Sequence, residues 1–464
     1  MSASRRDERR PVREVAVVWF RRDLRVHDHP ALTAAVAAGL VVPLFVADEV
    51  LLAGHRSCAR RTGRLWAAVA ALRAELAARG SRLVVRTGDP PSVVARVARE
   101  LGAAEVHVTA DHTPYARRRD TAVKRALAEV GGRLVEHPGL LVHEAGSIVT
   151  GSGHPYAVFG PFHRRWLATP MRQSLPAPAR IISPDALSTA PAGGRGADIA
   201  GSASPAAPSG EADAQHQLEA FLARLPTYAA DRDRLDREAT SRLSADLHFG
   251  TLSSVVLAER VAATAWPGAD RYLAELAWRD LYAHRMVAEA ADGVVDRDPV
   301  AWRHDPAAFA VWAVGRTGYP AVDAGMRQLA AEGWLSNRAR MIVASFLVKD
   351  LLIDWRLGAE HFLRHLEDGD VASNTGNWRW VAGVGPGAAP WFRIFDPVAQ
   401  GRRHDPDGRW IRSWLPELRE LPGSDVHEPW HASRPPTDYP PRVVDHAVAR
   451  RRALDAARAA RLGR

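Results

Sequence analysis

Residues 15–138 alternate short apolar runs with helical segments, and this alternation constrains the fold more than any other feature of the chain. The apolar runs are EVAVVWF, LVVPLFVAD, RLVVRTGD, EVHVTAD and RLVEH, and most are apolar on both faces. Between them lie segments such as TGRLWAAVAALRAELAARG, which has helical periodicity and ends at a glycine. Strands of this kind, separated by helices, are typical of a parallel sheet covered by helices. The pattern predicts a doubly wound α/β domain over residues 14–145.

The turn after the first expected strand lacks the glycine pattern of a dinucleotide-binding domain. It is RRDLRVHDHP, which contains no G-x-G-x-x-G, so the usual cradle for a pyrophosphate is absent from this turn. We therefore expect a dinucleotide to bind in a later part of the chain.

Two changes in composition divide the rest of the chain. Residues 146–215 are expected to link two domains, and residues 183–214 within them are rich in Ala, Gly, Pro and Ser. Such a stretch buries too little apolar surface to order itself, so we expect it to be disordered. From residue 216 onward the apolar residues recur with helical periodicity, which predicts a helical domain over residues 216–464. The expected fold class is α/β plus all-α, with a long linker between the two domains.

The composition of the 464 residues narrows the classes of function. Hydrophobic residues make up 47% and charged residues 25%, as in a soluble globular protein. The net charge of +9 comes mainly from arginine, which fits a polyanionic partner but also a codon-biased amino-acid usage. A single cysteine, Cys58, excludes a disulfide framework, a cysteine-rich zinc site and a four-cysteine iron–sulfur cluster. With neither a secretory leader nor an apolar run of about 18 residues, we expect a cytoplasmic protein without membrane or metal partners.

Residues 334–396 are apolar enough to form a helical core, yet they carry charged and amide side chains. Asn337, Arg340 and Met341 lie at i, i+3 and i+4, so a helix places them on one face. The polar and aromatic residues that follow are Asp368, Asp370, Asn374, Trp378 and Trp380. Buried carboxylates and amides need hydrogen-bond donors, which the ring N–H groups and ribose hydroxyls of a nucleotide supply. Taken singly, each of these residues also fits a helix cap or a core position.

Two further groups of residues favour polar ligands. The TSRLS segment carries hydroxyls just before an expected helix, which suits phosphate oxygens but also an ordinary helix cap. Its residues of interest are Thr240, Ser241, Leu243 and Ser244. Downstream, Glu275, Trp278 and Arg279 share one helix face, where the alternative is an i,i+4 ion pair beside a packed tryptophan.

Several runs together resemble the photolyase/cryptochrome family. NRARM, DGD, NWRWVAG and WFRIFDP are similar to its flavin-binding region, and the opening VVWFRRDLRVHDHPAL is similar to its first domain. Tyr228 also stands twelve residues before Thr240, as in that family. The resemblance spans nearly the whole chain except residues 183–214. It implies an FAD protein whose cofactor is held by Tyr228, Thr240, Ser241, Leu243, Ser244, Glu275, Arg279, Asn337, Arg340, Asp368, Asp370 and Asn374.

The same resemblance implies roles toward a DNA lesion. Glu275 would be the active-site acid between flavin and lesion, and Asn337 would reach both. Lesion and DNA contacts would come from Arg232, Trp278, Arg338, Met341, Trp380 and Arg393, of which the three arginines are expected on the surface. An electron relay from the surface to the flavin would consist of Trp302, Trp355 and Trp378.

Within the family, the chain is most similar to the bacterial class I enzymes that repair cyclobutane pyrimidine dimers. (6-4) photolyases have His at the positions of Asn337 and Met341. Asn374 stands where plant cryptochromes have Asp and animal cryptochromes have Cys. The resemblance implies a monomeric lyase for UV-damaged DNA, in which excited reduced FAD gives an electron to a dimer flipped out of the duplex, as photolyases do in general. The alternative is a blue-light sensory cryptochrome without repair activity.

The first domain is expected to hold a light-harvesting chromophore. In the folate-using branch a Glu helps to bind the chromophore, and Ala116 stands at the matching position. The pattern from Asp111 to Tyr115 is similar to the branch that uses an 8-hydroxy-5-deazaflavin, which we therefore favour over methenyltetrahydrofolate. The same loop also fits a strand end that leads into a helix started by proline.

Overall fold

The computed structural model describes residues 14–184, 209–292, 298, 300–385, 387, 390 and 393–462. Most of the expected disordered stretch, residues 185–208, lies outside this part of the chain. No helix within the described residues is long and apolar enough to cross a membrane.

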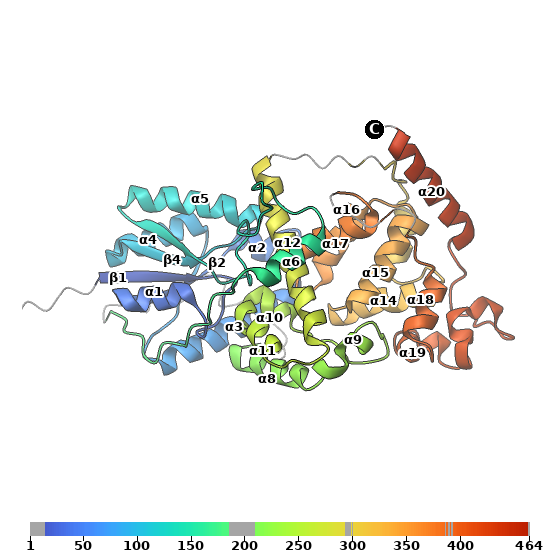
Figure 1. Ribbon diagram of the computed structural model, residues 1–464, viewed down its shortest axis with the longest axis horizontal. Helices are drawn as coiled ribbons and strands as arrows, with labels where there is room; N and C mark the ends of the chain where they lie inside the picture. Colours follow the sequence, from blue (N-terminus) through green and yellow to red (C-terminus); the bar gives the residue numbers. More distant parts are fainter. Residues whose placement is uncertain are drawn as a thin grey trace, which may run out of the picture.

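The first domain is a five-stranded parallel sheet, as predicted (Figure 1). Its strands are β1 (Glu14–Phe20), β2 (Gly39–Ala47), β3 (Val84–Thr87), β4 (Glu105–Thr109) and β5 (Arg133–His137), in the order β3-β2-β1-β4-β5. In the register, Val17 of β1 pairs with Val42 of β2 on one side and Val106 of β4 on the other. The strand order reverses between β1 and β4, the place where doubly wound sheets open a crevice at their carboxyl ends.

Helices cover both faces of this sheet because alternate strand residues point to opposite faces. They are α1 (Pro30–Ala38), α2 (Glu49–Ala53), α3 (Ala59–Ala78), α4 (Pro90–Leu101) and α5 (Pro114–Glu129). Val18 and Phe20 pack with residues of α1 and α3, whereas Val17 and Trp19 pack with residues of α4 and α5. Each face therefore has its own buried core, which explains why the strands read as apolar on both sides.

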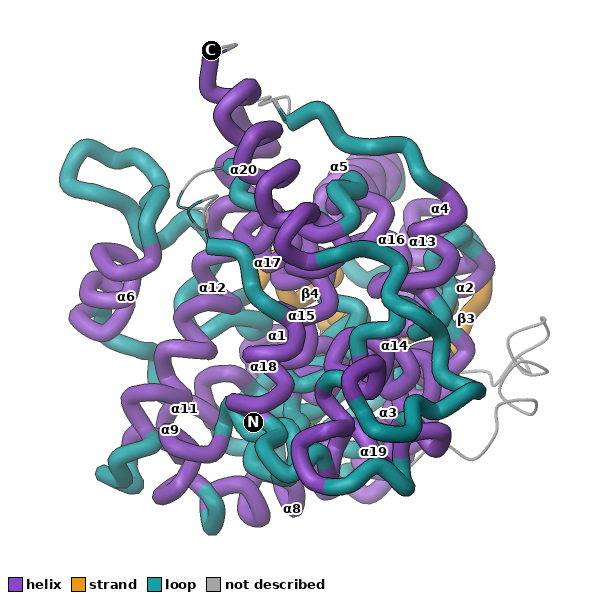
Figure 2. Tube along the Cα trace, turned by 90° about the vertical axis from the view of Figure 1, so that its right-hand side faces the viewer, coloured by secondary structure: helices purple, strands orange, loops and turns teal. Residues whose placement is uncertain are grey.

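The rest of the described chain is largely helical (Figures 1 and 2). The α-helices are α6 (Phe159–Ala168), α8 (Glu211–Leu222), α9 (Tyr228–Asp231), α10 (Ser244–Phe249), α11 (Ser254–Ala262), α12 (Ala269–Asp292), α13 (Pro306–Ala313), α14 (Pro320–Glu332), α15 (Asn337–Ser345), α16 (Trp355–His365), α17 (Val371–Ala382), α18 (Pro397–His404), α19 (Arg409–Trp414) and α20 (His446–Leu462). A π-helical turn, η2 (Phe346–Asp350), extends α15, and short 3-10 turns are η1 (Leu225–Thr227), η3 (Pro416–Leu418), η4 (Gly423–His427) and η5 (Pro429–His431). Seen from the end of this domain, the strands lie behind helices and loops (Figure 2).

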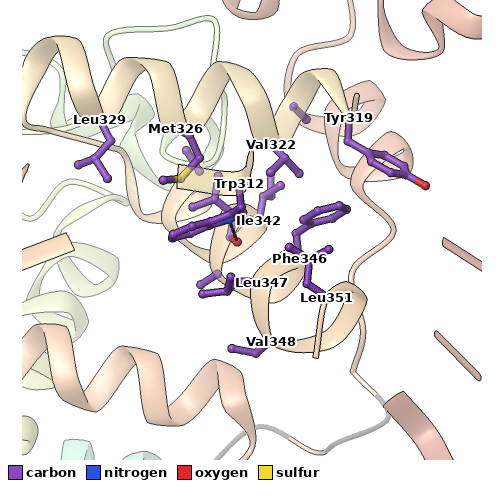
Figure 3. Packing of buried hydrophobic residues seen from close by; sticks show 14 of the residues in the cluster. Trp312, Tyr319, Val322, Met326, Leu329, Ile342, Phe346, Leu347, Val348 and Leu351 are labelled. Carbon is purple, nitrogen blue, oxygen red and sulfur yellow. Dashed lines mark hydrogen bonds between the residues drawn. The ribbon is translucent and has the colours of Figure 1, made fainter. Parts of the chain in front are cut away.

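The core of the helical domain is built around Trp312 (Figure 3). Its indole is fully buried, and its Nε1 donates to the Val343 carbonyl over 3.0 Å. Met326, Ile342 and Leu347 belong to the same cluster. This core fixes α14, α15 and η2 relative to one another, and α15 carries several of the expected site residues.

The linker is more ordered than its composition predicts. α6 lies within it, and α8 begins at Glu211, five positions before the expected start of the helical domain. The expectation of disorder is therefore wrong for residues 209–214. The physical reason is a contact between residues far apart in the sequence. The Glu211 carboxylate accepts hydrogen bonds from Val26 N (2.8 Å) and His27 N (3.1 Å) of the first domain.

The two domains meet along a tightly packed junction. Asp28 is fully buried and accepts hydrogen bonds from both Arg172 Nη atoms, Ser253 Oγ and Leu175 N, so it ties together the first domain, the linker and α11. Gly250, with φ +66°, lies so close to the Arg22 backbone that a Cβ would come within 2.1 Å of its carbonyl oxygen. The junction thereby positions the carboxyl ends of the strands against the helical domain.

Candidate functional site

One face of α12 presents the carboxylate, indole and guanidinium predicted to lie together. Glu275, Trp278 and Arg279 occupy i, i+3 and i+4 of this 24-residue helix, and all three are half-buried. Tyr282 continues the face one turn later, with its ring 5.5 Å from that of Trp278. Phe159 of α6 stacks on the Trp278 indole with ring centroids 3.9 Å apart and an interplanar angle of 2°.

Glu275 is paired with Arg232, which differs from the surface position expected for this arginine. Arg232 is 8% exposed, and its Nη1 donates to Glu275 Oε1 in a short ion pair. Burial acts to lower the pKa of Arg232, but the nearby charge of Glu275 outweighs it and raises the pKa. Arg271 lies 3.7 Å from the same Oε1, so one oxygen of the carboxylate carries both cationic contacts. Arg232 therefore belongs to the site and not to the outer surface.

The TSRLS segment has the backbone shape of an anion-binding nest. Arg242 is in the left-handed region, with φ +55°, and Leu243 follows with φ −85° and ψ 5°. Successive residues of opposite hand turn their N–H groups toward one concavity, which suits a phosphate. Ser241 Oγ accepts hydrogen bonds from Tyr272 Oη (2.9 Å) and Leu243 N (3.3 Å), which fixes the loop against α12.

The expected residues around this loop differ in exposure. Tyr228 is buried, with its ring 5.3 Å from that of Tyr272, whereas Ser244 is exposed at the start of α10. Thr240 is half-buried and opens onto a surface cleft. The other residues that line this cleft are Gln217, Ala220, Arg224, Glu238 and Arg242.

The two aspartates of the DGD segment have different partners. Asp368 accepts a hydrogen bond of 2.8 Å from Arg340 Nη2 of α15. Asp370 caps α17 by accepting from Ser373 N (2.8 Å), and it also accepts from Arg22 Nη2 (3.0 Å) of the first domain. Burial acts to raise the pKa of Asp370, but the charges of Arg22 and Arg279 prevail and hold it well below its usual range. Asp370 therefore stays ionised and couples the junction to the site.

Two more expected cofactor ligands are oriented by backbone carbonyls. Arg279 donates to the carbonyls of Leu140 (2.7 Å) and Leu247 (3.2 Å), while burial lowers its pKa against the opposing charge of Asp370. Asn374 is buried on α17, and its Nδ2 donates to the Ala359 carbonyl over 3.0 Å. Arg279 and Asp370 thus bring α12 and α17 together electrostatically.

Trp378 and Trp380 point in different directions, as their spacing on a helix predicts. Trp378 is 3% exposed and packs against Phe362 (5.1 Å) and Trp312 (6.2 Å). Trp380 is half-buried and lines a narrow cleft between α12 and α17, together with Tyr282. Arg393 is exposed, with its guanidinium carbon 5.8 Å from the centroid of the Trp380 ring.

Asn337 and Met341 open toward solvent from α15. Asn337 is exposed at the first position of the helix, which is capped by Ser336, and Met341 is half-buried one turn later. Arg338 lies between them in sequence. Its Nη2 donates to Asp233 over 2.7 Å, so this arginine, like Arg232, is already paired with a carboxylate.

The two outer tryptophans of the expected relay share one carboxylate. Trp302 Nε1 and Trp355 Nε1 lie 2.7 and 3.2 Å from Asp298 Oδ2, to which Arg356 also donates (3.1 Å). Trp355 and Trp378 belong to the same buried cluster, with Trp302 packed against it.

Some residues of the site were not predicted from the sequence. For Phe159 a signal exists, because the spacing of Phe159, Phe162 and Trp166 places three rings on one helix face. No local pattern predicts that Arg22 reaches Asp370 or that Asp298 joins two indoles, because these contacts depend on the packing of distant segments.

The residues present fit a bound dinucleotide such as FAD. The TSRLS nest and Arg279 suit phosphates, and the Arg340–Asp368 pair and the Asn374 amide offer fixed polar groups to a ring system. The chemistry of the donors therefore agrees with the cofactor that the sequence predicts.

Both domains match known protein families. Residues 16–179 match the family model described as DNA photolyase, and residues 272–459 match the FAD binding domain of DNA photolyase. The chain is 44% identical to a deoxyribodipyrimidine photo-lyase of Streptomyces griseus over 94% of this chain and 98% of that protein. The corresponding protein of Escherichia coli is 37% identical, over 97% of this chain and 99% of its own length.

Solved structures give the same result. A class III photolyase from Agrobacterium tumefaciens has a TM-score of 0.87 and 34% identity, covering 97% of this chain and 98% of that one. A cryptochrome from Synechocystis has a TM-score of 0.86 and 28% identity, covering 96% of this chain and 99% of that one. The full-length relatives, the two family models and the site geometry together show that the chain belongs to the photolyase/cryptochrome family.

Proposed function

We infer that this protein is a deoxyribodipyrimidine photo-lyase, which uses light to repair cyclobutane pyrimidine dimers in DNA. The observation that carries this function is the full-length similarity to relatives of that name, which extends over both domains. We assign the chain to the class I enzymes, because Asn337 and Met341 stand on the face of α15 where (6-4) photolyases carry His.

FAD is the cofactor of the helical domain. We propose that the nest at residues 240–244, with Tyr228 and Arg279, holds its phosphates, and that Asn337, Arg340, Asp368, Asp370 and Asn374 hold its rings and ribose. When bound in reduced form and excited by light, FAD supplies the electron that splits the dimer and receives it back. The protein contributes binding, orientation and electrostatics.

On the substrate side, we propose that the half-buried face of α12 receives the flipped dimer. Trp278 and Trp380 would stack on its bases, with Met341 as a further apolar contact, since aromatic side chains stabilise unstacked bases. Arg232 and Arg271 both lie against Oε1 of Glu275. We therefore assign Glu275 Oε2 to accept a ring N–H of a dimer base, and the ion pair to hold that oxygen in place.

Contacts to the DNA backbone are assigned to arginines around this face. Arg393 is exposed beside Trp380 and is the first candidate for a phosphate contact. Arg338 is paired with Asp233 in the described structure, so a phosphate would have to replace that carboxylate. Action as a monomer is proposed from the family resemblance alone.

Trp302, Trp355 and Trp378 are proposed to carry electrons inward toward the cofactor site. The Asp298 carboxylate accepts hydrogen bonds from both outer indoles and is paired with Arg356, whose guanidinium carbon lies 4.8 Å from the centroid of the Trp355 ring. The shared carboxylate therefore holds the two outer rings of the proposed relay in place.

For the light-harvesting chromophore, we propose an 8-hydroxy-5-deazaflavin in preference to methenyltetrahydrofolate. Ala116 is buried on α5 and offers no carboxylate for a folate. Asp111 and Tyr115 are engaged by Arg22 and Asp48 near the carboxyl ends of β1 and β4, where doubly wound folds bind ligands. Extraction and absorbance of the chromophore from purified protein would decide between the two.

The decisive experiment incubates photoreduced protein with an oligonucleotide that contains one thymine cyclobutane dimer, with and without blue light. We expect recovery of thymine absorbance in the light only. No recovery with reduced FAD bound would contradict the repair function and favour a sensory cryptochrome.

A further inference from the structure

A stack of aromatic rings from the linker covers one face of Trp278. The Phe159 ring lies 3.9 Å from the indole and parallel to it within 2°. The His163 imidazole, one turn later on the same helix, is also stacked on Phe159, at 5.1 Å with an interplanar angle of 11°. Trp278 is nevertheless only half-buried, and its other aromatic neighbour, Tyr282, lies 5.5 Å away at an interplanar angle of 31°.

Phe159 has two stacked aromatic neighbours. Its half-buried ring contacts both the His163 imidazole and the Trp278 indole. Burial lowers the pKa of His163, so its ring is neutral near pH 7 and stacks as an uncharged aromatic. Two ring contacts therefore restrain Phe159 in its place on the indole.

The helix that carries Phe159 is anchored to α12 by two further aromatic residues. Phe162 is fully buried, with its ring 5.4 Å from His284, and Trp166 Nε1 donates to Asp280 Oδ2 over 2.9 Å. The backbone N–H of His143 donates to the same oxygen over 3.0 Å. Because Asp280 and His284 lie on the same helix as Trp278, these contacts fix the position of α6 along α12. Phe159 is thereby placed against the Trp278 indole.

We propose that Phe159 is a positioning residue for lesion recognition, which fixes the Trp278 indole so that its other face is ready to stack on a flipped pyrimidine. This inference rests on the proposed function and extends the site to the linker. An indole whose ring orientation is already set loses less freedom when a base stacks on it, so binding is tighter. Phe159 does not itself contact the lesion in this arrangement.

The test compares Phe159→Leu and Phe159→Ala with the protein as isolated, loaded with FAD. Dark binding to a duplex with one thymine cyclobutane dimer and to the undamaged duplex is measured, together with repair per bound dimer at saturating substrate. Both variants should weaken lesion binding about tenfold, from the size of aromatic stacking contributions. Binding to undamaged DNA and repair of the bound dimer should change less than about twofold.

Two further variants separate positioning from general damage to the fold. Phe159→Tyr keeps the ring and should restore lesion binding to within about twofold, whereas Leu167→Ala, at an exposed position of the same helix, should leave it unchanged. Lesion binding by Phe159→Leu equal to the unaltered protein would overturn the inference. An equal loss on damaged and undamaged DNA would also overturn it. If the unaltered protein does not prefer the lesion, the proposed function itself fails.

Discussion

Asp28 at the domain junction and Glu275 on α12 are both carboxylates paired with arginine, yet they differ in how completely they are satisfied. Asp28 is fully buried, and both of its oxygens accept hydrogen bonds from side chains or backbone of two other segments, the linker and the start of α11. The Glu275 side chain is 28% exposed, and its two cationic neighbours lie against one oxygen. A carboxylate whose partners are complete holds a fold together, whereas one with a remaining acceptor can bind a substrate.

The largest effect is expected from the junction. Asp28→Asn keeps a residue that tolerates the left-handed backbone at this position, where φ is +49°, and removes only the charge. Arg172 then loses its anionic partner at a buried site, so the free energy of unfolding should fall by about 3 kcal/mol, measured by urea denaturation. Asp407→Ala, at an exposed ion pair, is the control and should change it by less than about 0.5 kcal/mol. Equal stability of Asp28→Asn and the unaltered protein would remove the distinction between the two carboxylates.

Glu275→Gln should leave the protein folded, because Arg232 keeps Asp233 as an anionic neighbour at 3.6 Å, and should reduce repair. The amide retains the shape but no longer offers a charged acceptor, so repair of dilute dimer substrate should fall about 10- to 100-fold. Flavin absorbance of the purified variant should show FAD still bound. Glu360→Gln, which loses a partly exposed ion pair to Arg56, should repair normally. Loss of FAD from Glu275→Gln would show that the residue serves the cofactor and not the lesion.

Trp378→Phe tests the proposed electron relay on the buried side of α17 separately from DNA binding on its exposed side. Removal of the indole nearest the core should slow photoreduction of oxidised flavin more than about tenfold, because phenylalanine is far harder to oxidise, while dark binding of lesion DNA stays unchanged. Flavin absorbance under continuous blue light with an added thiol gives the rate. Trp266→Phe, at an exposed position, serves as the control. Photoreduction at the normal rate would reject the assigned relay.

The smallest effect should come from Arg393, at the open edge of the site. Arg393→Ala should weaken binding to damaged and undamaged DNA alike by about two- to threefold and lower the salt slope by about one counterion. Binding titrations at several salt concentrations measure both quantities. Arg125→Ala, exposed on α5, should leave them unaltered. A slope that does not respond to Arg393→Ala would exclude a phosphate contact.

Local sequence patterns predicted the elements and much of the site. All five strands and the helical second domain are present as predicted, because strand and helix periodicities depend on residues a few positions apart. The i, i+3, i+4 groups on α12 and α15 lie on single helix faces for the same reason. Residues 209–214 were predicted wrongly, since the order of α8 depends on the contact of Glu211 with Val26 and His27.

The partners of the polar and aromatic residues were decided by tertiary structure. Arg22 meets Asp370 across 348 positions of the chain, and Arg232 meets Glu275 across 43. The stack of Phe159 on Trp278 and the sharing of Asp298 by two indoles likewise join separate segments. By itself, the sequence determined which residues lie on which face of each strand and helix. Only the packing of these elements decided which charges are neutralised and which groups remain open to a ligand, because burial and pairing depend on neighbours that are distant along the chain.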